Sequence, residues 1–367
     1  MAGVVLILVG CGGPAASPSM GPSGGPSVGP SSAASATPSA APGAIQINGA
    51  GATFPYPLYS RWFYEYAFVD SSVKFNYQSI GSGGGIKQIT EKTVDFGASD
   101  AILNTDQFAA APGIQMFPTV AGADVPIYNI SALADAAPLT LDPATLTGIF
   151  LGTITKWNDP AIATTNPGVT LPDLDIIVVH RSDGSGTTYI FTDYLSNVSQ
   201  QWKDNVGTAS SVEWPVGLGG KGNEGVTGTV TQNDGAIGYV ELAYAAANNL
   251  KIANMVNASG NTVTASLDST QAALADFGGD MPDTLARSVV NAPGANSWPI
   301  AGYTYLLLYM DQTNCQAANK LVEFIDWAQS EGTQFATALN YVALPDNVKT
   351  QMLAKVDQIT CNGAPLN

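Results

Sequence analysis

The chain has 367 residues, which is enough for two domains of ordinary size, and 45% of them are hydrophobic. Its 13 basic and 29 acidic residues give a formal net charge of −16, which argues against nucleic acid because phosphate backbones require basic neutralisation. The single histidine, His180, argues against histidine-rich metal sites and against a Ser-His triad. We expect no cofactor and no metal.

The N-terminal segment has the composition of a targeting sequence followed by a linker. Residues 1–10 are apolar but too short to span a bilayer, and they lead into Leu8-Val9-Gly10-Cys11. This tetrapeptide resembles the lipobox of bacterial lipoproteins, although the usual preceding basic residues are absent. We therefore predict a signal peptide over 1–10 and a lipid such as palmitate on Cys11. Residues 12–44 are almost wholly Gly, Pro, Ser and Ala, which predicts a disordered tether over 11–44.

Two further cysteines, Cys315 and Cys361, remain after Cys11 is assigned to lipidation. In an oxidising compartment they would form a disulfide that closes a long C-terminal loop. Two buried free thiols are the alternative.

From residue 45 onward the sequence repeats a pattern of apolar strand, small-residue turn and helix. Strands are expected at 45–47, 73–77 and 94–98, and helical spacing follows the first two of them. Two more apolar strands are expected at 115–120 and 125–129. This alternation predicts an α/β fold, in which ligands bind at the carboxyl ends of the strands.

The later part of the chain repeats this unit and then closes with helices. An apolar strand at 176–179 precedes a glycine-rich turn and a helix that includes residues 189–195. A strand at 303–310 and amphipathic helices at 318–329 and 346–359 complete the prediction.

The nonapeptide HRSDGSGTT, His180–Thr188, carries the clearest chemistry in the sequence. It joins a strand to a helix start, where free N–H groups and the positive end of the helix dipole attract an anion. Arg181 adds a guanidinium, Ser185 and Thr187 add hydroxyl donors, and Gly186 lets the backbone approach a ligand closely. An ordinary helix capped by Ser185 is the alternative.

Four residues at other strand ends would join this motif in one pocket if the ends converge: Thr53, Phe54, Ser82 and Asp100. The acidic net charge does not oppose a tetrahedral oxyanion there, because distant charges are screened over about 8–10 Å at physiological salt. The Asp100 carboxylate would accept a hydrogen bond from protonated phosphate and repel sulfate, unless Asp100 is simply a helix N-cap. Asp183 would hold the Arg181 guanidinium.

Several long motifs resemble the phosphate-binding proteins that serve the bacterial ABC-type phosphate importer. These motifs are Ile47–Pro55, Gly81–Ser82, Val94–Asp100, Lys156–Pro160, Arg181–Thr187, Val216–Asn223 and Ala236–Glu241. The resemblance covers nearly the whole chain after the tether.

The resemblance implies a two-lobed type II periplasmic-binding-protein fold of the α/β class, with a mixed sheet in each lobe and two crossover strands. Lobe 1 would comprise residues 45–129 and 298–367, and lobe 2 residues 130–297. The implied function is high-affinity extracytoplasmic binding of inorganic phosphate and its delivery to an ABC transporter permease by a monomer anchored to the cell membrane. The implied phosphate ligands are Thr53, Phe54, Ser82, Asp100, Arg181, Ser185, Gly186 and Thr187.

Other functions are less well supported by the residues. A phosphatase or serine hydrolase would use Ser185 or Ser82, but neither lies in a G-x-S-x-G motif. His180 precedes Arg181 on a strand and so points to the opposite face. The same fold binding another oxyanion, or serving as a surface adhesin, is a further alternative. We therefore predict a binding protein and not an enzyme.

Overall fold

The computed structural model describes residues 41–279 and 281–366, so the predicted signal peptide, Cys11 and most of the predicted tether lie outside the described residues. Within these ranges, every helix is either too short or too polar to cross a bilayer.

Three neighbouring strands begin the fold because apolar runs alternate with turns of small residues. β1 (Ile45–Gly51) pairs in parallel with β2 (Val73–Ser79) on one side and with β3 (Phe96–Ser99) on the other. The expected helices follow the first two strands as α1 (Tyr56–Val69) and α2 (Ser82–Thr90). The carboxyl ends of the three strands therefore lie together at one edge of the sheet.

The long strand β4 (Ile114–Asn129) replaces the two strands that were expected at 115–120 and 125–129. The chain stays extended through residues 121–123 because β12 (Ala301–Tyr309) pairs with them. A Cβ atom on Gly122 would lie 2.9 Å from the Phe54 ring. The small residues at this point therefore allow close packing and do not form a turn.

β4 also joins the two parts of the sheet. It pairs with β12 up to Ala123 and with β8 (Ala236–Glu241) from Asp124 onward. β8 pairs in parallel with β6 (Ile177–Arg181), and β6 pairs in parallel with β7 (Leu218–Gly220). The strand order is β2-β1-β3-β12-β4-β8-β6-β7, with β9 attached to β4.

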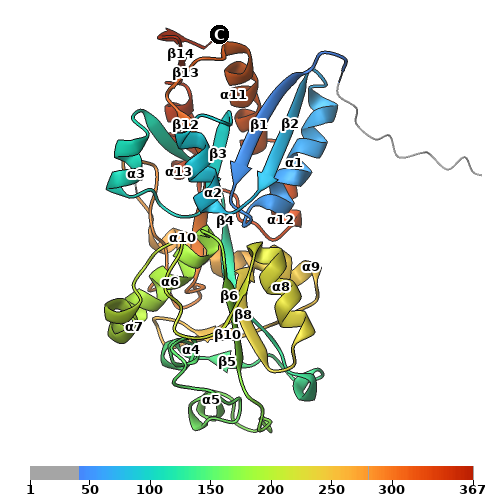
Figure 1. Cartoon of the computed structure of the whole chain (residues 1–367), viewed down its shortest axis with the longest axis vertical. Coiled ribbons are helices and arrows are strands. Elements are labelled where there is room, and N and C mark those ends of the chain that lie inside the picture. The colour runs from blue at the N-terminus through green and yellow to red at the C-terminus, as the bar shows by residue number, and fades with distance from the viewer. Residues whose placement is uncertain (1–40, 280, 367) are drawn as a thin grey trace, which may run out of the picture. The chain divides into compact units, whose positions relative to one another are not determined.

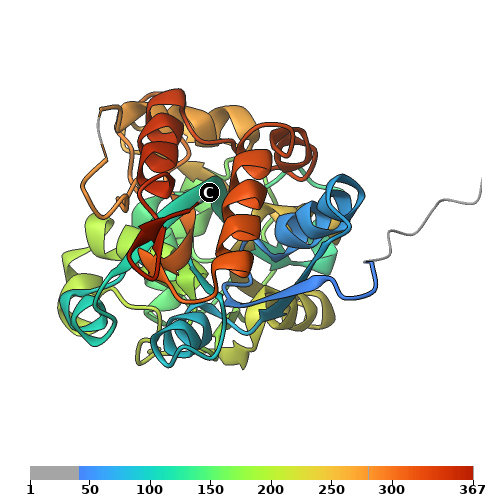
Figure 2. The same ribbon diagram turned by 90° about the horizontal axis from the view of Figure 1, so that it is seen from above.

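We call the elements built on β1, β2, β3 and β12 the first lobe, and those built on β6, β7 and β8 the second lobe (Figure 1). The first lobe has a mixed sheet, as predicted, because β12 runs antiparallel to β3. In the second lobe β6, β7 and β8 are parallel, and β4, antiparallel to β8, makes that sheet mixed too. Helices lie against both sheets; Figure 2 shows α1 and the C-terminal helices over the first lobe. The other elements are α3 (Thr105–Ala110), η1 (Ser131–Leu133), β5 (Thr140–Leu141), α4 (Pro143–Phe150), α5 (Pro160–Thr165), α6 (Gly186–Val198), α7 (Gln200–Asn205), α8 (Gly222–Gln232), α9 (Leu242–Ala247), β9 (Lys251–Ile252), β10 (Asn254–Val256), β11 (Thr262–Val263), α10 (Leu267–Asp276), β13 (Asp311–Gln312), α11 (Cys315–Gln329), α12 (Thr333–Ala338), α13 (Asp346–Val356), β14 (Thr360–Cys361) and β15 (Ala364–Pro365).

A disulfide joins Cys315, the first residue of α11, to Cys361 in β14, with 5.5 Å between their Cα atoms. The predicted pairing is therefore present, and the free-thiol alternative is wrong. The two cysteines are 46 positions apart in the sequence, and the stretch that they delimit includes α11, α12 and α13.

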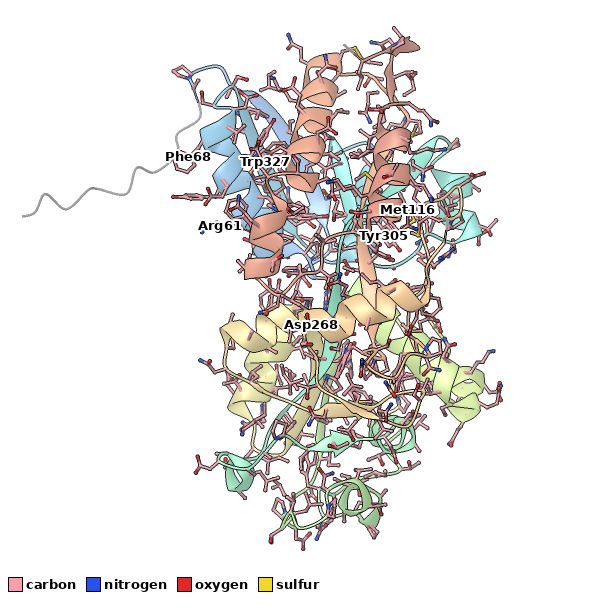
Figure 3. The ribbon with its side chains drawn as sticks, turned by 180° about the vertical axis from the view of Figure 1, so that it is seen from behind. Arg61, Phe68, Met116, Asp268, Tyr305 and Trp327 are labelled. Carbon is pink, nitrogen blue, oxygen red and sulfur yellow. A yellow bond between two sulfur atoms is a disulfide. The ribbon has the colours of Figure 1, made fainter. Side chains whose placement is uncertain are left out.

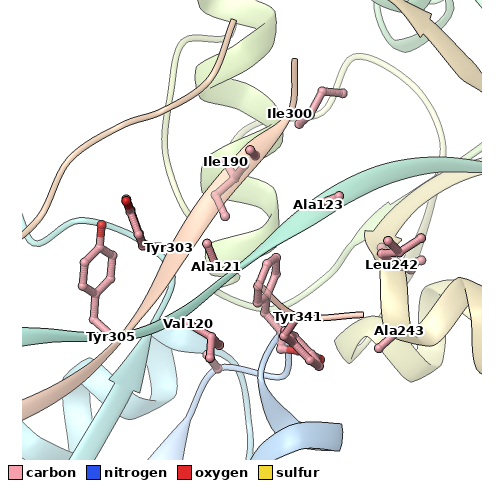
Figure 4. Packing of buried hydrophobic residues seen from close by; sticks show 14 of the residues in the cluster. Val120, Ala121, Ala123, Ile190, Leu242, Ala243, Ile300, Tyr303, Tyr305 and Tyr341 are labelled. Carbon is pink, nitrogen blue, oxygen red and sulfur yellow. The ribbon is translucent and has the colours of Figure 1, made fainter. Parts of the chain in front are cut away.

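Apolar side chains fill the region where β4 crosses between the lobes (Figure 4). Ala121 and Ala123 of β4 are buried there with Ile190 of α6 and Tyr303 of β12. A Cβ atom on Gly302 would lie 2.3 Å from the Ile190 side chain, so α6 packs directly against the backbone of β12.

Two carboxyl groups are buried beside each other at the same crossing. Asp124 of β4 and Glu241 of β8 face each other in the antiparallel ladder, so their side chains leave the same face of the sheet. Both are fully buried, and in the described structure three of their four carboxyl oxygens have no hydrogen-bond partner. Burial raises the pKa of both groups well above its usual range, and repulsion from Glu241 raises that of Asp124 further.

We predict that the free energy of unfolding falls as pH rises, and that Asp124→Asn weakens this dependence. A carboxyl group whose pKa is higher in the folded state binds more protons there. Stability is therefore lost as pH rises from the unfolded pKa of about 4 through the higher folded value. Urea unfolding at pH 5 and pH 8 should show a smaller loss of stability in the variant than in the unaltered protein.

Asp106→Asn, in the exposed first turn of α3, controls for the removal of one surface carboxylate. The same pH dependence in Asp124→Asn and in the unaltered protein would contradict the prediction.

Candidate anion-binding site

Four loops meet where the strand ends of the two lobes face each other. All eight residues predicted as ligands lie in these loops; seven of them are at most 3% exposed, and the eighth, Gly186, is buried too. The first lobe contributes Thr53 and Phe54 after β1, Ser82 at the start of α2 and Asp100 after β3; the second contributes Arg181 at the end of β6 and Ser185, Gly186 and Thr187 at the start of α6.

The two lobes contact each other directly at this place. The backbone N–H of Gly186 donates to Ser82 Oγ at 3.0 Å, and the backbone N–H of Asn223 donates to Thr53 Oγ1 at 3.3 Å. A Cβ atom on Gly186 would lie 2.4 Å from Asp100 Oδ2 and 2.6 Å from Ser82 Oγ. The absence of a side chain at Gly186 is therefore what allows this approach.

Arg181 is held by a bidentate ion pair with Asp183. Its Nε donates to Asp183 Oδ1 at 2.8 Å and its Nη2 to Oδ2 at 2.6 Å, while Oδ1 also accepts from the N–H of Gly222 at 3.0 Å. Burial opposes both charges, but the hydrogen bonds between the partners outweigh it; they raise the pKa of Arg181 and lower that of Asp183. The remaining nitrogen, Nη1, lies 3.4 Å from Thr187 Oγ1 and from Asn223 Oδ1.

Asp100 is the acidic member of the site. Its Oδ1 accepts a hydrogen bond from Thr304 Oγ1 at 2.7 Å, and its Oδ2 lies 3.4 Å from Ser82 Oγ. Burial raises the pKa of Asp100 to about 7, although the Thr304 hydroxyl, the Arg181 charge and the Ser82 hydroxyl each lower it. Asp100 therefore gains or loses its proton near neutral pH. The alternative that Asp100 caps the next helix is wrong, because Asn104 caps α3.

Three helices begin at the site. Ser82 is the first residue of α2, Gly186 of α6 and Gly222 of α8. The positive ends of their dipoles together favour an anion. In this structure the N–H groups of Gly186 and Gly222 already donate within the site, to Ser82 Oγ and Asp183 Oδ1. Ser185 also caps α6, since its Oγ accepts from the N–H of Thr188 at 3.0 Å. Ser185 is therefore both the N-cap of α6 and a residue of the site.

Asn223 belongs to the site but was not predicted as part of it. Its side chain is fully buried, and its amide lies 3.4 Å from both Arg181 and Thr187. A signal existed in the sequence, because β7, a glycine turn and α8 repeat the strand–turn–helix unit of the other loops. The charged residue of that turn, Lys221, is exposed.

Comparison with known proteins identifies the family. Residues 36–331 match the PBP superfamily domain. The phosphate-binding protein PstS of Pasteurella multocida is 45% identical over 309 residues, which are 84% of this chain and 89% of that protein. PstS of Methanocaldococcus jannaschii is 34% identical over 337 residues, 86% of each chain. The chain belongs to the PstS family of phosphate-binding proteins.

Solved structures agree with the fold expected for the PstS family. A high-affinity periplasmic phosphate-binding protein solved with phosphate superposes with a TM-score of 0.66 at 20% identity, covering 84% of this chain and 93% of the other. The phosphate-binding protein of Stenotrophomonas maltophilia gives a TM-score of 0.63 at 19% identity, covering 85% and 94%. The predicted family and the type II periplasmic-binding-protein fold are therefore confirmed.

We predict that Asp183→Asn destabilises this PstS-family chain by about 3–5 kcal/mol, because the buried Arg181 loses its anionic partner. Urea unfolding at neutral pH measures the change. Asp173→Asn is the matched control, since Asp173 pairs with Lys156 at 2.6 Å while the two side chains are 70% and 49% exposed. This control should leave stability nearly unchanged. Equally small effects of both substitutions would count against a buried ion pair.

Proposed function

We propose that this protein binds inorganic phosphate between its two lobes outside the cytoplasm and delivers it to the permease of an ABC-type phosphate importer. The proposed lobes are residues 45–129 with 298–367, and residues 130–297. The observation that carries the proposal is the site itself, in which hydroxyls, backbone N–H groups, one guanidinium and one carboxylate from both lobes meet. Relatives named phosphate-binding proteins, at 34–45% identity over most of the chain, support it.

The donor set suits a tetrahedral oxyanion without a large excess of positive charge. Asp183 balances the charge of Arg181, so hydroxyl and N–H dipoles would provide most of the stabilisation. Such dipoles act at contact distance, where the overall net charge of −16 has little effect. The proposed ligands are Thr53, Phe54 through its backbone, Ser82, Asp100, Arg181, Ser185, Gly186 and Thr187, with Asp183 in support.

Asp100 would select for an anion that carries a proton. Its pKa of about 7 means that one proton can be held either by the carboxyl group or by the bound phosphate at neutral pH. In both cases a hydrogen bond forms between them. Sulfate carries no proton at this pH, so an ionised Asp100 would repel it, and selectivity then combines an attraction with a repulsion.

Binding between the lobes would favour the closed arrangement, since ligand contacts to both lobes exist only there. Two segments connect the lobes at the crossing, and they are bonded to each other. The N–H of Asp124 in β4 donates to the carbonyl of Ile300, and the Trp298 indole donates to the carbonyl of Asp124 at 3.0 Å. A movement that opens the two lobes would therefore bend both connecting segments together.

A hydrolytic function lacks support in the same residues. The ring of His180 stacks on Trp214, with 4.8 Å between centroids, and its Nδ1 lies 3.0 Å from the carbonyl oxygen of Arg181. Because this is the only histidine in the chain, Ser82 and Ser185 have no imidazole base. The relatives named above are binding proteins, and we propose binding without catalysis.

We further propose that a lipid on Cys11 holds the monomeric protein at the outer face of the cell membrane. The lipobox-like Leu8-Val9-Gly10-Cys11 and the Gly/Pro/Ser/Ala-rich segment after it support this part of the proposal.

We predict that Asp100→Asn reduces the ratio of phosphate to sulfate affinity at least tenfold. An amide does not repel sulfate, and its NH₂ group can donate to an oxygen that carries no proton. Titration calorimetry with both anions at pH 7 measures the ratio. Asp106→Asn in exposed α3 is the control and should keep the original ratio; an unchanged ratio in Asp100→Asn would refute the role of Asp100.

We predict that Gly186→Ala lowers phosphate affinity by roughly 10–100-fold, because an added methyl group meets Asp100 and Ser82 and opposes closure. Gly228→Ala is the matched control, since a Cβ atom on this α8 glycine meets nothing within 4 Å. The same calorimetry applies, and native affinity in Gly186→Ala would show that the lobes bind phosphate without this contact.

A further inference from the structure

The outer end of α1 exposes three apolar side chains, which we call the α1 patch: Tyr64, Phe68 and Val69, exposed by 42%, 53% and 57%. Tyr64 and Phe68 are one turn apart and their rings meet edge to face, with 5.5 Å between centroids. The Arg61 guanidinium lies 5.9 Å from the centre of the Tyr64 ring. Figure 3 shows Arg61 and Phe68 on the outer side of α1. Clustered exposure of this kind marks an interaction surface more often than single exposed residues do.

The described chain begins beside this patch. The N–H of Ala41 donates to the carbonyl of Ser71 at 2.9 Å, and the N–H of Ile45 donates to the carbonyl of Ser72 at 2.8 Å. Ser71 follows Val69, the last residue of α1, by only two positions. The segment that leads back to Cys11 is therefore attached at the same end of α1 as the patch.

We propose that the α1 patch rests on the lipid bilayer that holds the Cys11 anchor. This inference depends on the anchor proposed above. At most about 100 Å of extended chain separates Cys11 from Ala41, so an anchored protein stays within that distance of the membrane. Weak contacts then form repeatedly at high effective concentration. Tyrosine and phenylalanine suit the interface of a bilayer, and an apolar contact adds a second attachment to the acyl anchor.

Most of the charge that flanks the patch in sequence is paired. The net charge of −16 would repel anionic headgroups, but the two acidic residues that flank the patch in sequence are paired. Glu65 lies 2.6 Å from Arg61, and Asp70 lies 2.9 Å from Lys320. Lys320 also lies 2.7 Å from Glu323, so this end of α1 keeps a small excess of negative charge.

Contact at the patch also leaves the anion site open to solution. α1 begins at Tyr56, directly after the site residues Thr53 and Phe54, and ends at Val69. Its 14 residues span roughly 20 Å, so the patch and the site lie at opposite ends of one helix. A protein resting on α1 would keep its site away from the bilayer.

The test uses the full chain, lipidated at Cys11 and bound to vesicles of phosphatidylcholine and phosphatidylglycerol. Phe68→Cys carries an environment-sensitive fluorophore, and Leu218→Cys, which replaces a side chain 50% exposed in β7 of the second lobe, carries the same label as the control. We expect blue-shifted emission and quenching by nitroxide lipids at position 68 but not at position 218. Adding Tyr64→Ser and Val69→Ser should reduce the quenching at 68 severalfold.

Three results would overturn the proposal. If the fluorophore at position 68 keeps the emission of a water-exposed label while the protein is bound to vesicles, bilayer contact is ruled out and the anchor is not. A blue shift that depends on protein concentration without vesicles assigns the patch to a second copy of the chain. Failure of the chain to float with vesicles removes both the anchor and the bilayer contact. Phosphate titration of each variant keeps these outcomes separate from a failure of the phosphate site itself.

Discussion

The ion pair between Arg181 and Asp183 determines what kind of site this protein has. Because Asp183 takes two of the guanidinium nitrogens, only Nη1 faces Thr187 and Asn223, and the net charge of the pair is zero. An anion held here depends on oriented dipoles more than on a surplus of cations. The N-termini of α2, α6 and α8 supply those dipoles, and they come from both lobes.

The close contacts around the site depend on small residues at two places. Gly186 lets the start of α6 reach Ser82, and the Ala-Gly-Ala segment of β4 lets Phe54 pack against the strand that joins the lobes. In both places the backbone of one element, α6 or β4, lies against a side chain of another, Ser82 or Phe54. A Cβ atom at Gly186 would lie 2.6 Å from Ser82 Oγ, and one at Gly122 would lie 2.9 Å from the Phe54 ring; both are too close for van der Waals contact.

Much of this could be predicted from the sequence, because the strand–turn–helix units are local and the site residues follow the strand ends. The motifs around Thr53, Ser82, Asp100 and Arg181 gave both the family and the loops that converge. What could not be predicted depends on pairing between distant segments. The continuity of β4 requires β12 as its partner, and the acidic pair requires the register that sets Asp124 opposite Glu241. Asn223 was not predicted for a different reason. Its side chain is uncharged and lies after a glycine turn, so its role in the site becomes clear only from its position beside Arg181.

The disulfide between Cys315 and Cys361 makes one part of the fold depend on redox conditions. The ladder of β13, β14 and β15 has two residues per strand, too few to hold the end of the chain without help. The sulfur crosslink fastens this ladder to α11, and it forms only in an oxidising environment. Reduction would remove the only covalent crosslink between this ladder and α11 in the described residues, so the C-terminal end is the part of the fold that is sensitive to the redox state of the surroundings.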